Sequence, residues 1–441
     1  MSTSVSSRRD FLKNASLASG LLLLPSGFLK GQNAPSNRIQ VASVGVGGQG
    51  GTDTNGVSKA GATIIGLCDV DSRNLAGAKK RFPKASAFTD YREMFDKLGK
   101  EIDAVTVSIP DHMHFSVAYT AVGLGKHVYV QKPLTHTVDQ TRRLAALAAE
   151  KGIVSQMGNQ GNSTPHIRIL KEWYEAGLFG EVSKVTAWTN RPVWPQGMAA
   201  YNPEKPVPKH LAWDLWLGAA KPIAYRDGLH SFKWRGYYAF GCGALGDMAA
   251  HVLNPANYIL ELGLPSKIEV EVPSKSEVAF PLSSRIVFHF PGTTKRGPIE
   301  LTWLDGVPKN KQPFNGARLN DASGSYFTGS ECSFAAGENG NPINTFPEEK
   351  FKAFQEKNVP QKYERVKRGH YQNWVDSIRK GEKAVSDFSY SGPFSEIMLL
   401  GVIAQRLGRT LEWDAKAGQF KNDAEANALV KAQPAPQGFL S

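Results

Sequence analysis

The sequence has few cysteines, no long apolar run after its N-terminal region and no low-complexity tract. Its three cysteines are too few and too far apart for a disulfide framework, a C-x-x-C redox motif or a zinc site. No apolar stretch after the N-terminal region approaches the ~20 residues that a membrane-spanning helix needs, so a multi-span membrane protein is excluded. With 41% hydrophobic and 21% charged residues, the composition is that of a globular protein.

The charge of the chain is unbalanced but not concentrated. Lysine and arginine number 52 against 40 acidic residues, which gives a net charge of +12. Part of the excess lies in the first thirty residues, and the rest is scattered rather than gathered in long runs of one sign. A nucleic-acid partner requires a basic groove or patch, so none is predicted.

The N-terminal segment has the features of a targeting signal. Residues 7–13 read S-R-R-D-F-L-K and precede a weakly apolar stretch at 15–24, which is too short to cross a bilayer. The segment resembles a twin-arginine export signal, which is read by machinery that moves folded proteins. We therefore expect residues 1–34 to be an export signal, the twin-arginine translocation machinery to be a partner, and the location to be periplasmic or otherwise extracytoplasmic. A retained signal would anchor the protein to the membrane.

At 441 residues the chain is long enough for two or three domains. From Asn37, short β-rich runs alternate with helical stretches. The runs lie at 39–44, 63–68, 104–109, 128–131 and 153–157. Such alternation predicts βαβ units that form a doubly wound parallel sheet, here a Rossmann domain at 37–158.

After Gly158 the pattern changes to longer strands that alternate more openly. The expected strands are 182–189, 267–272, 285–290, 299–304 and 325–328, and the expected helices are 166–176, 370–379 and 394–407. This pattern predicts a second, α+β domain at 159–441 with a mostly antiparallel open sheet. The chain as a whole is therefore placed in the α/β class.

A glycine-rich turn follows the first expected strand and reads G-V-G-G-Q-G from Gly45 to Gly50. The pattern G-x-G-x-x-G between a strand and a helix is typical of dinucleotide binding, because the glycines admit a pyrophosphate to the amides at the helix start. Asp69 ends the second strand, where a carboxylate accepts hydrogen bonds from ribose hydroxyls and favours NAD over NADP. The predicted cofactor residues of this region are Gly45, Gly47, Gly48, Gln49, Gly50 and Asp69.

Two further segments carry a resemblance to a known family: S-I-P-D-H-M-H at 108–114 and G-K-H-V-Y-V-Q-K-P at 125–133. With them, the chain after Asn37 resembles the Gfo/Idh/MocA family of glucose-fructose oxidoreductase and inositol dehydrogenase. The family's usual E-K-P reads Gln131-Lys132-Pro133 here. The resemblance implies that Lys132 is the active-site lysine. The cofactor contacts that it implies are Pro110, His114 and Lys132.

A third segment contains Asp247 and His251 in a D-x-x-x-H pattern. In a helix, these two side chains would share a face. From the residues alone, the favoured interpretation is that Asp247 is a helix cap and His251 a core histidine. The resemblance implies instead that His251 takes the hydroxyl proton while hydride moves to the nicotinamide, with Asp247 beside it in the substrate pocket. Histidine suits this task because its usual pKa is near neutrality.

Tryptophans crowd into the segment 188–238, next to asparagine and arginine. Flat apolar faces combined with multi-donor groups recognise polyol rings. The residues expected to bind substrate are Asn190, Arg191, Trp194, Trp234 and Arg235. An oligomer interface would use the same residues equally well. Members of the family that the chain resembles are often dimers or tetramers, so a homo-oligomer is expected.

Together these features predict an NAD-dependent oxidoreductase. It would transfer a hydride between a secondary alcohol or ketone of a sugar, glycoside or cyclitol and the nicotinamide. The catalytic candidates are Lys132, Asp247 and His251, and no metal is required. An exported protein should carry its dinucleotide with it, so tight binding of NAD is expected. The alternative is an NAD-dependent glycoside hydrolase or lyase that acts through transient oxidation and elimination.

Overall fold

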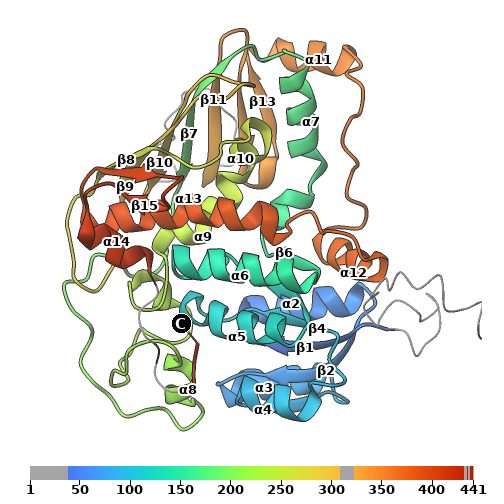
Figure 1. The fold of residues 1–441 in the computed structure, drawn as a ribbon, viewed down its shortest axis with the longest axis vertical. Helices are drawn as coiled ribbons and strands as arrows, with labels where there is room; N and C mark the ends of the chain where they lie inside the picture. The colour runs from blue at the N-terminus through green and yellow to red at the C-terminus, as the bar shows by residue number, and fades with distance from the viewer. Residues whose placement is uncertain (1–37, 308–321, 432–434, 436–437, 441) are drawn as a thin grey trace, which may run out of the picture. The chain divides into compact units, whose positions relative to one another are not determined.

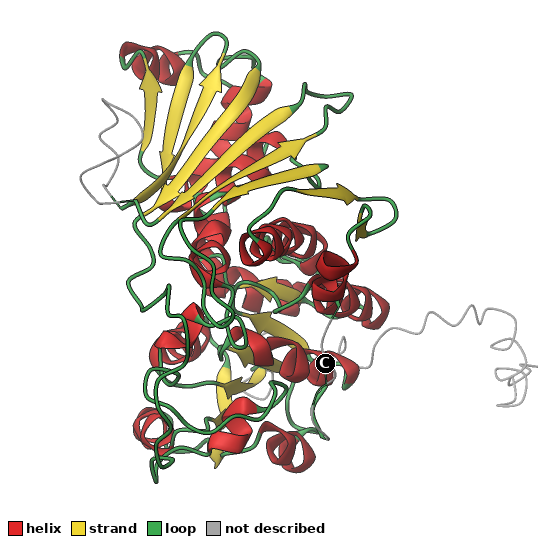
Figure 2. Cartoon of the chain, turned by 90° about the vertical axis from the view of Figure 1, so that its left-hand side faces the viewer, coloured by secondary structure: helices red, strands yellow, loops and turns green. Residues whose placement is uncertain are grey.

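The computed structural model describes residues 38–307, 322–431, 435 and 438–440, so the expected export signal at 1–34 lies outside it. Residues 39–441 form one unit that contains two β-sheets, shown in two views in Figures 1 and 2. Within the described residues, no helix combines the length and the apolar character needed to cross a membrane.

The first sheet is parallel throughout and has the strand order β3-β2-β1-β4-β5-β6. Its strands are β1 (Gln40–Val44), β2 (Thr63–Cys68), β3 (Ser86–Phe88), β4 (Ala104–Val107), β5 (His127–Val130) and β6 (Ser155–Met157). The central strands are runs of apolar residues buried on both faces, as a parallel sheet covered by helices requires. The predicted doubly wound fold is confirmed.

The helices of this half begin in two different ways. They are α2 (Gly48–Lys59), α3 (Ser72–Arg81), α4 (Tyr91–Leu98), α5 (Asp111–Gly123) and α6 (Val138–Lys151). The helices α3, α4 and α6 are each capped by the side chain of Asp71, Asp90 or Thr137. The helices α2 and α5 begin after Gly47 and Pro110 with no side-chain cap. Their first backbone amides therefore lack the usual side-chain acceptor, which suits a ligand site.

The second sheet is mostly antiparallel and has the order β13-β12-β11-β7-β10-β9-β8-β14-β15. Its strands are β7 (Val182–Thr189), β8 (Lys267–Glu271), β9 (Ser284–Phe290), β10 (Ile299–Asp305), β11 (Ser323–Gly329), β12 (Ser333–Gly337), β13 (Ile343–Phe346), β14 (Leu411–Asp414) and β15 (Gln419–Phe420). Among the strands described in this sheet, only β7 and β10 pair in parallel. Buried and half-exposed residues alternate along β10, which is typical of a sheet with one face on a core.

Helix α13 (Phe388–Leu407) joins the two sheets into one core. It packs against α6 and α9 (Gly243–Val252) and also contacts β8, and Figure 1 shows it between the two sheets. Buried residues of both halves, such as Val105 in β4 and Leu301 in β10, belong to the same hydrophobic cluster. Apart from α8 (Trp213–Leu217), which is described with the next segment, the remaining α-helices after β6 are α7 (Pro165–Glu175), α10 (Asn254–Leu260), α11 (Glu349–Glu356), α12 (His370–Lys380) and α14 (Ala424–Val430).

A long connection between β7 and α9, residues 190–242, is called the arm below. It contains the short helix α8 (Trp213–Leu217) and has a small hydrophobic cluster of its own, made mostly of tryptophan, tyrosine and leucine. A backbone hydrogen bond of 2.9 Å from Ala212 N to Val70 O holds the arm against the chain just after β2. The arm therefore lies beside the carboxyl ends of the parallel strands.

Candidate active site

A cleft of about 600 Å³ lies at the carboxyl ends of the parallel strands, where a doubly wound sheet binds its ligand. Its wall includes the glycine turn after β1, the loops after β4 and β5, helix α9 and the arm. Every predicted site residue lines this cleft except Asn190. The Asn190 Oδ1 instead accepts a hydrogen bond of 2.9 Å from Arg191 Nη1. Of these two residues, only Arg191 lines the cleft, so the predicted substrate contact would have to come from Arg191.

Three glycines of the turn leave no room for a Cβ atom. Gly45 has a φ of +80°, and a Cβ there would lie 2.2 Å from the carbonyl oxygen of Ser108. A Cβ on Gly50 would lie 2.1 Å from the carbonyl oxygen of Gly45, and one on Gly47 would lie 2.3 Å from the Asn74 side chain. Together with the uncapped amides at the start of α2, the turn fits a pyrophosphate group.

Asp69 follows β2 and braces the glycine turn. Its Oδ2 accepts a hydrogen bond of 3.0 Å from Val46 N, and its Oδ1 accepts one of 2.9 Å from Asp71 N. Burial raises the pKa of the Asp69 carboxyl, while these amides act in the opposite direction. The nearby Arg73 is held by Asp71 at 2.7 Å, so its guanidinium is tied to a carboxylate of its own. The predicted contact of Asp69 with a ribose stays a prediction.

His114 joins the two loops that carry Pro110 and Lys132. Its Nδ1 lies 2.8 Å from the carbonyl oxygen of Pro133, and its Nε2 lies 2.8 Å from that of Ile109. The ring therefore fixes the loop after β4 to the loop after β5, which positions the lysine. Both ring nitrogens already face backbone oxygens, so a cofactor would have to compete with these oxygens for the ring. The cofactor contact expected of His114 stays a prediction.

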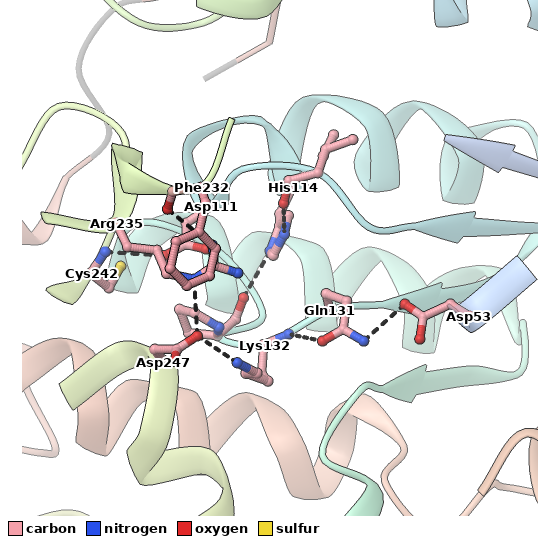
Figure 3. Close-up of polar contacts among 11 residues, drawn as sticks. Asp53, Asp111, His114, Gln131, Lys132, Phe232, Arg235, Cys242 and Asp247 are labelled. Atoms are coloured by element: carbon pink, nitrogen blue, oxygen red, sulfur yellow. Dashed lines mark hydrogen bonds and ion pairs between the residues drawn. The ribbon is translucent and has the colours of Figure 1, made fainter. Parts of the chain in front are cut away.

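Three charged side chains meet in the cleft, as Figure 3 shows. Lys132 Nζ donates to Asp247 Oδ1 at 2.7 Å, and Arg235 Nε donates to the same oxygen at 3.1 Å. Burial raises the pKa of Asp247, but the two cations outweigh it and hold this pKa well below its usual value. Asp247 is therefore a carboxylate at neutral pH, fixed between an ammonium and a guanidinium.

Helix α9 begins at Gly243, so Asp247 lies inside it and is not the helix cap that the sequence left open. His251 follows four residues later, on the same face of the helix, and also lines the cleft. Burial and then the Lys132 ammonium lower the pKa of His251 to about 3, so its ring is neutral. Its Nδ1 is buried and has no hydrogen-bond partner in the described part of the chain.

Sequence reasoning missed several residues of the site, among them Asn339 and Asp111. Asn339 has a buried Oδ1 without a partner among the described residues, and its side chain favours the charged form of His251. Asp111 lines the cleft and accepts a hydrogen bond of 3.0 Å from Cys242 N. Burial raises the pKa of Asp111 to about 7, although Arg235 opposes this. The position of Asp111 directly after the proline of S-I-P-D was a signal for it, whereas Asn339 has none in the sequence.

The tryptophans of the arm expose less surface to the cleft than their number indicates. Trp194 and Trp234 line the cleft but are only 4% and 5% exposed, and Trp194 Nε1 already donates to Gln196 Oε1 at 2.9 Å. Arg235 lies over the Trp234 ring, 4.3 Å from its centre. Phe232, which the sequence did not single out, is 48% exposed at the cleft. A substrate would therefore meet Phe232 and the arginines more than the broad tryptophan faces.

Comparison with known proteins identifies the family. Residues 39–159 match the Gfo/Idh/MocA model described as oxidoreductase family, NAD-binding Rossmann fold. Residues 166–439 match the model described as oxidoreductase family, C-terminal alpha/beta domain. This chain belongs to the Gfo/Idh/MocA oxidoreductase family. The resemblance drawn from the sequence is confirmed, and so is NAD as the cofactor of its Rossmann fold.

Curated relatives match this Gfo/Idh/MocA chain over less than half of their own length. Levoglucosan dehydrogenase of Pseudarthrobacter phenanthrenivorans is 28% identical over 194 residues, which cover 44% of this chain and 42% of that protein. Inositol 2-dehydrogenase of Rubrobacter xylanophilus is 27% identical over 157 residues, which cover 35% of this chain and 44% of that protein. Both relatives are dehydrogenases of a sugar or a cyclitol by name.

Solved structures share the fold over more of the chain. Levoglucosan dehydrogenase in complex with NADH and levoglucosan has a TM-score of 0.57 at 16% identity, covering 86% of this chain and 99% of that one. The WlbA dehydrogenase from Bordetella pertussis in complex with NADH and UDP-GlcNAcA has a TM-score of 0.59 at 15% identity, with the same coverage of both chains. At these identities, the likeness shows the common fold.

Proposed function

We propose that this Gfo/Idh/MocA oxidoreductase transfers a hydride between NAD and a secondary alcohol or ketone of a sugar, glycoside or cyclitol. One observation carries the proposal: the Lys132–Asp247 ion pair and the His251 imidazole line the same cleft as the glycine turn. The substrate class is supported by the names of the relatives, which refer to levoglucosan and inositol.

NAD, when bound, supplies the nicotinamide carbon that accepts or returns the hydride. The residues that would hold it are the glycines of the turn, and at Gly45, Gly47 and Gly50 a Cβ would collide with backbone or with Asn74. Asp69 lines the same part of the cleft. The donor and acceptor types of this region thus fit a dinucleotide.

The Lys132 ammonium has three N–H donors, of which Asp247 takes one. A second donor is available for the substrate oxygen, and the positive charge stabilises the negative charge that develops on this oxygen during oxidation. Asp247, which Arg235 helps to keep ionised, holds the ammonium in place. These two residues therefore position and polarise the oxygen.

His251 is neutral and can accept the hydroxyl proton during oxidation and return it during reduction, but burial beside Lys132 makes it a weaker base than a free imidazole. Because Nδ1 is buried, Nε2 is the nitrogen left to face the substrate. A hydrogen bond from Nδ1–H to Asn339 Oδ1, which neither atom makes in this structure, would fix that tautomer.

The test is a screen of glycosides and cyclitols with the purified protein and NAD+. We expect absorbance of reduced nicotinamide to rise with at least one of them, together with an oxidised product. Release of the aglycone without accumulation of NADH would overturn the proposal and support the hydrolase or lyase alternative raised by the sequence.

We also propose that the protein is exported by the twin-arginine pathway with NAD tightly bound. The S-R-R-D-F-L-K segment supports export, and the scarcity expected of free NAD outside the cytoplasm supports tight binding. Substitution of Arg8 and Arg9 by lysine should keep the protein in the cytoplasm. If the exported form, purified without added nucleotide, releases no NAD(H) on extraction, the tight-binding proposal is wrong.

A dimer or tetramer is proposed from the family resemblance. Trp194, Trp213, Trp216 and Trp234 are already buried within the chain, so an interface through the arm would use exposed side chains such as Val193, Val207 and Phe232 instead. Light scattering of the purified protein tests the proposal, and a monomer at all concentrations would refute it.

A further inference from the structure

A carboxylate without a cationic partner lies directly behind the cleft. Asp53, in α2, is 0% exposed, and no lysine, arginine or histidine of the described residues forms an ion pair with it. A buried carboxylate is destabilising unless hydrogen bonds satisfy both of its oxygens. The side chains around Asp53 therefore have to supply the donors.

Four side chains do so. The Asp53 Oδ1 accepts hydrogen bonds from Gln49 Nε2 and Tyr371 Oη, both at 2.8 Å. Its Oδ2 accepts from Ser108 Oγ at 2.6 Å and from Gln131 Nε2 at 2.9 Å, and Figure 3 shows the last of these bonds. Four donors match the four lone pairs of a carboxylate. These five residues, called the Asp53 cluster below, join α2, the loops after β4 and β5, and α12.

The Asp53 cluster reaches the cleft through three of its donors, Gln49, Ser108 and Gln131, which line it. An ionised carboxylate only accepts hydrogen bonds, so Asp53 determines that each glutamine turns Nε2 towards it. The carbonyl oxygen Oε1 is then the atom that each glutamine can offer on its other side. For Gln131, this oxygen lies 3.4 Å from the backbone nitrogen of Lys132.

Gln131 stands where the family's E-K-P pattern has a glutamate. A glutamate at this position would bring a second carboxylate to about the distance of the present Gln131–Asp53 hydrogen bond, where two carboxylates do not both ionise. The negative charge behind the cleft is therefore held at Asp53, and Gln131 is the neutral side chain that tolerates it.

We propose that Asp53 is a positioning residue of the cofactor cleft and carries the charge that the family pattern places at residue 131. It orients Gln131, the residue before Lys132, together with Gln49 at the start of α2 and Ser108 after β4. The inference rests on the proposed NAD-dependent function for its catalytic meaning.

Asp53→Asn, Gln131→Glu and the double variant of the full-length chain test this. We measure Tm without nucleotide, NAD+ affinity by tryptophan fluorescence, and KM for NAD+ separately from kcat. Asp53→Asn turns an acceptor into a donor that faces other donors, and Gln131→Glu brings two carboxylates together, so each should lower Tm by several degrees and weaken NAD+ binding about tenfold. In the double variant, the introduced amide can donate to the introduced carboxylate, so affinity should return to within about threefold of the parent.

Asp96→Asn is the matched control, because Asp96 is an exposed aspartate on α4, and it should change none of these quantities. If the double variant is no better than the worse single variant, the charge is not transferable and the inference fails. It also fails if Asp53→Asn melts and binds NAD+ like Asp96→Asn. None of the stability and affinity readouts requires turnover, so a chain that binds NAD+ but oxidises no sugar or cyclitol would refute the proposed function and leave this inference standing.

Discussion

The cleft has two walls that are built from different material. The glycine wall, residues 45–50, presents mainly backbone, and a Cβ on Gly45 or Gly50 would collide with a carbonyl oxygen. The α9 wall is made of side chains, with Asp247 and His251 on one helix face and Arg235 from the arm beside them. Lys132 extends from the parallel-sheet side to the α9 wall and ends on Asp247.

The difference teaches that binding and chemistry are separable in this molecule. Backbone recognition is sensitive to added atoms, because there is no space for them, whereas the α9 wall depends on charges at particular atoms. Substitutions in the glycine wall should therefore change nucleotide affinity, and substitutions in the α9 wall should change turnover. Three variants can break or sharpen this division, and a fourth measurement tests the burial of His251 behind it.

The largest effect is expected from His251→Ala. Loss of the general base should lower kcat by about 10²–10⁴-fold, while NAD+ affinity stays that of the parent because the glycine wall is untouched. Steady-state kinetics and a nucleotide titration check the two halves of this statement. Unchanged turnover would remove His251 from the proposed role.

Lys132→Met should lower kcat by about 10²–10³-fold. The variant loses the ammonium that stabilises developing negative charge, while Asp247 keeps Arg235 as a partner and the fold survives. Lys97→Met, at an exposed position of α4, is the control and should leave kcat and KM unchanged. A loss confined to KM, with kcat unchanged, would show that Lys132 only binds substrate.

Gly50→Ala should weaken NAD+ binding by about tenfold or more, since forcing a methyl group into a filled space costs about 1–3 kcal/mol. Its Cβ would lie 2.1 Å from the Gly45 carbonyl oxygen. Gly77→Ala in α3 is the matched control, because nothing lies within 4 Å of the added atom. Equal affinity of the two variants would contradict the tightness of the glycine wall.

Acid should weaken the folded state through its buried histidines, the smallest of the four effects near neutral pH. Burial lowers the pKa of His112 and His251 to about 3, and of His136 and His370 to about 4. The unfolded chain gains these protons below about pH 6.5, so the free energy of unfolding should fall as the pH drops from 6.5 towards 4. Urea unfolding at several pH values measures this. His251→Asn should make the dependence shallower, and an unchanged slope would show that this ring is solvated.

Most of the first sheet could be predicted because its signals are local. The strand β2 has the predicted bounds 63–68, since an apolar run bounded by polar turns determines it. The strand β7 in the second sheet has the predicted bounds 182–189, where apolar and polar residues mix more openly. The strand β3 escaped prediction because it has three residues, Ser86–Phe88, too few to show a period. Helix α13 begins at Phe388, six residues before the expected start at 394, because Asp387 caps it there.

The site could be predicted where a motif exists and not where it depends on the tertiary fold. The glycines, Lys132, Asp247 and His251 follow patterns in the sequence and meet in one cleft. Asp53 is satisfied by Gln131 and Tyr371, which are 78 and 318 residues away along the chain, so no local pattern could indicate its role. The tryptophans were predictable as a cluster, but whether their faces reach the cleft or each other depends on packing.

Because α13 packs against helices of both halves, we expect that the Rossmann part does not fold stably on its own. A fragment that ends near residue 158 would lack α13, the 20-residue helix that covers α6. The apolar surface of α6 would then be exposed to water, and the fragment would need another element to cover it. For the same reason, heat should melt the two halves together, as one calorimetric peak rather than two.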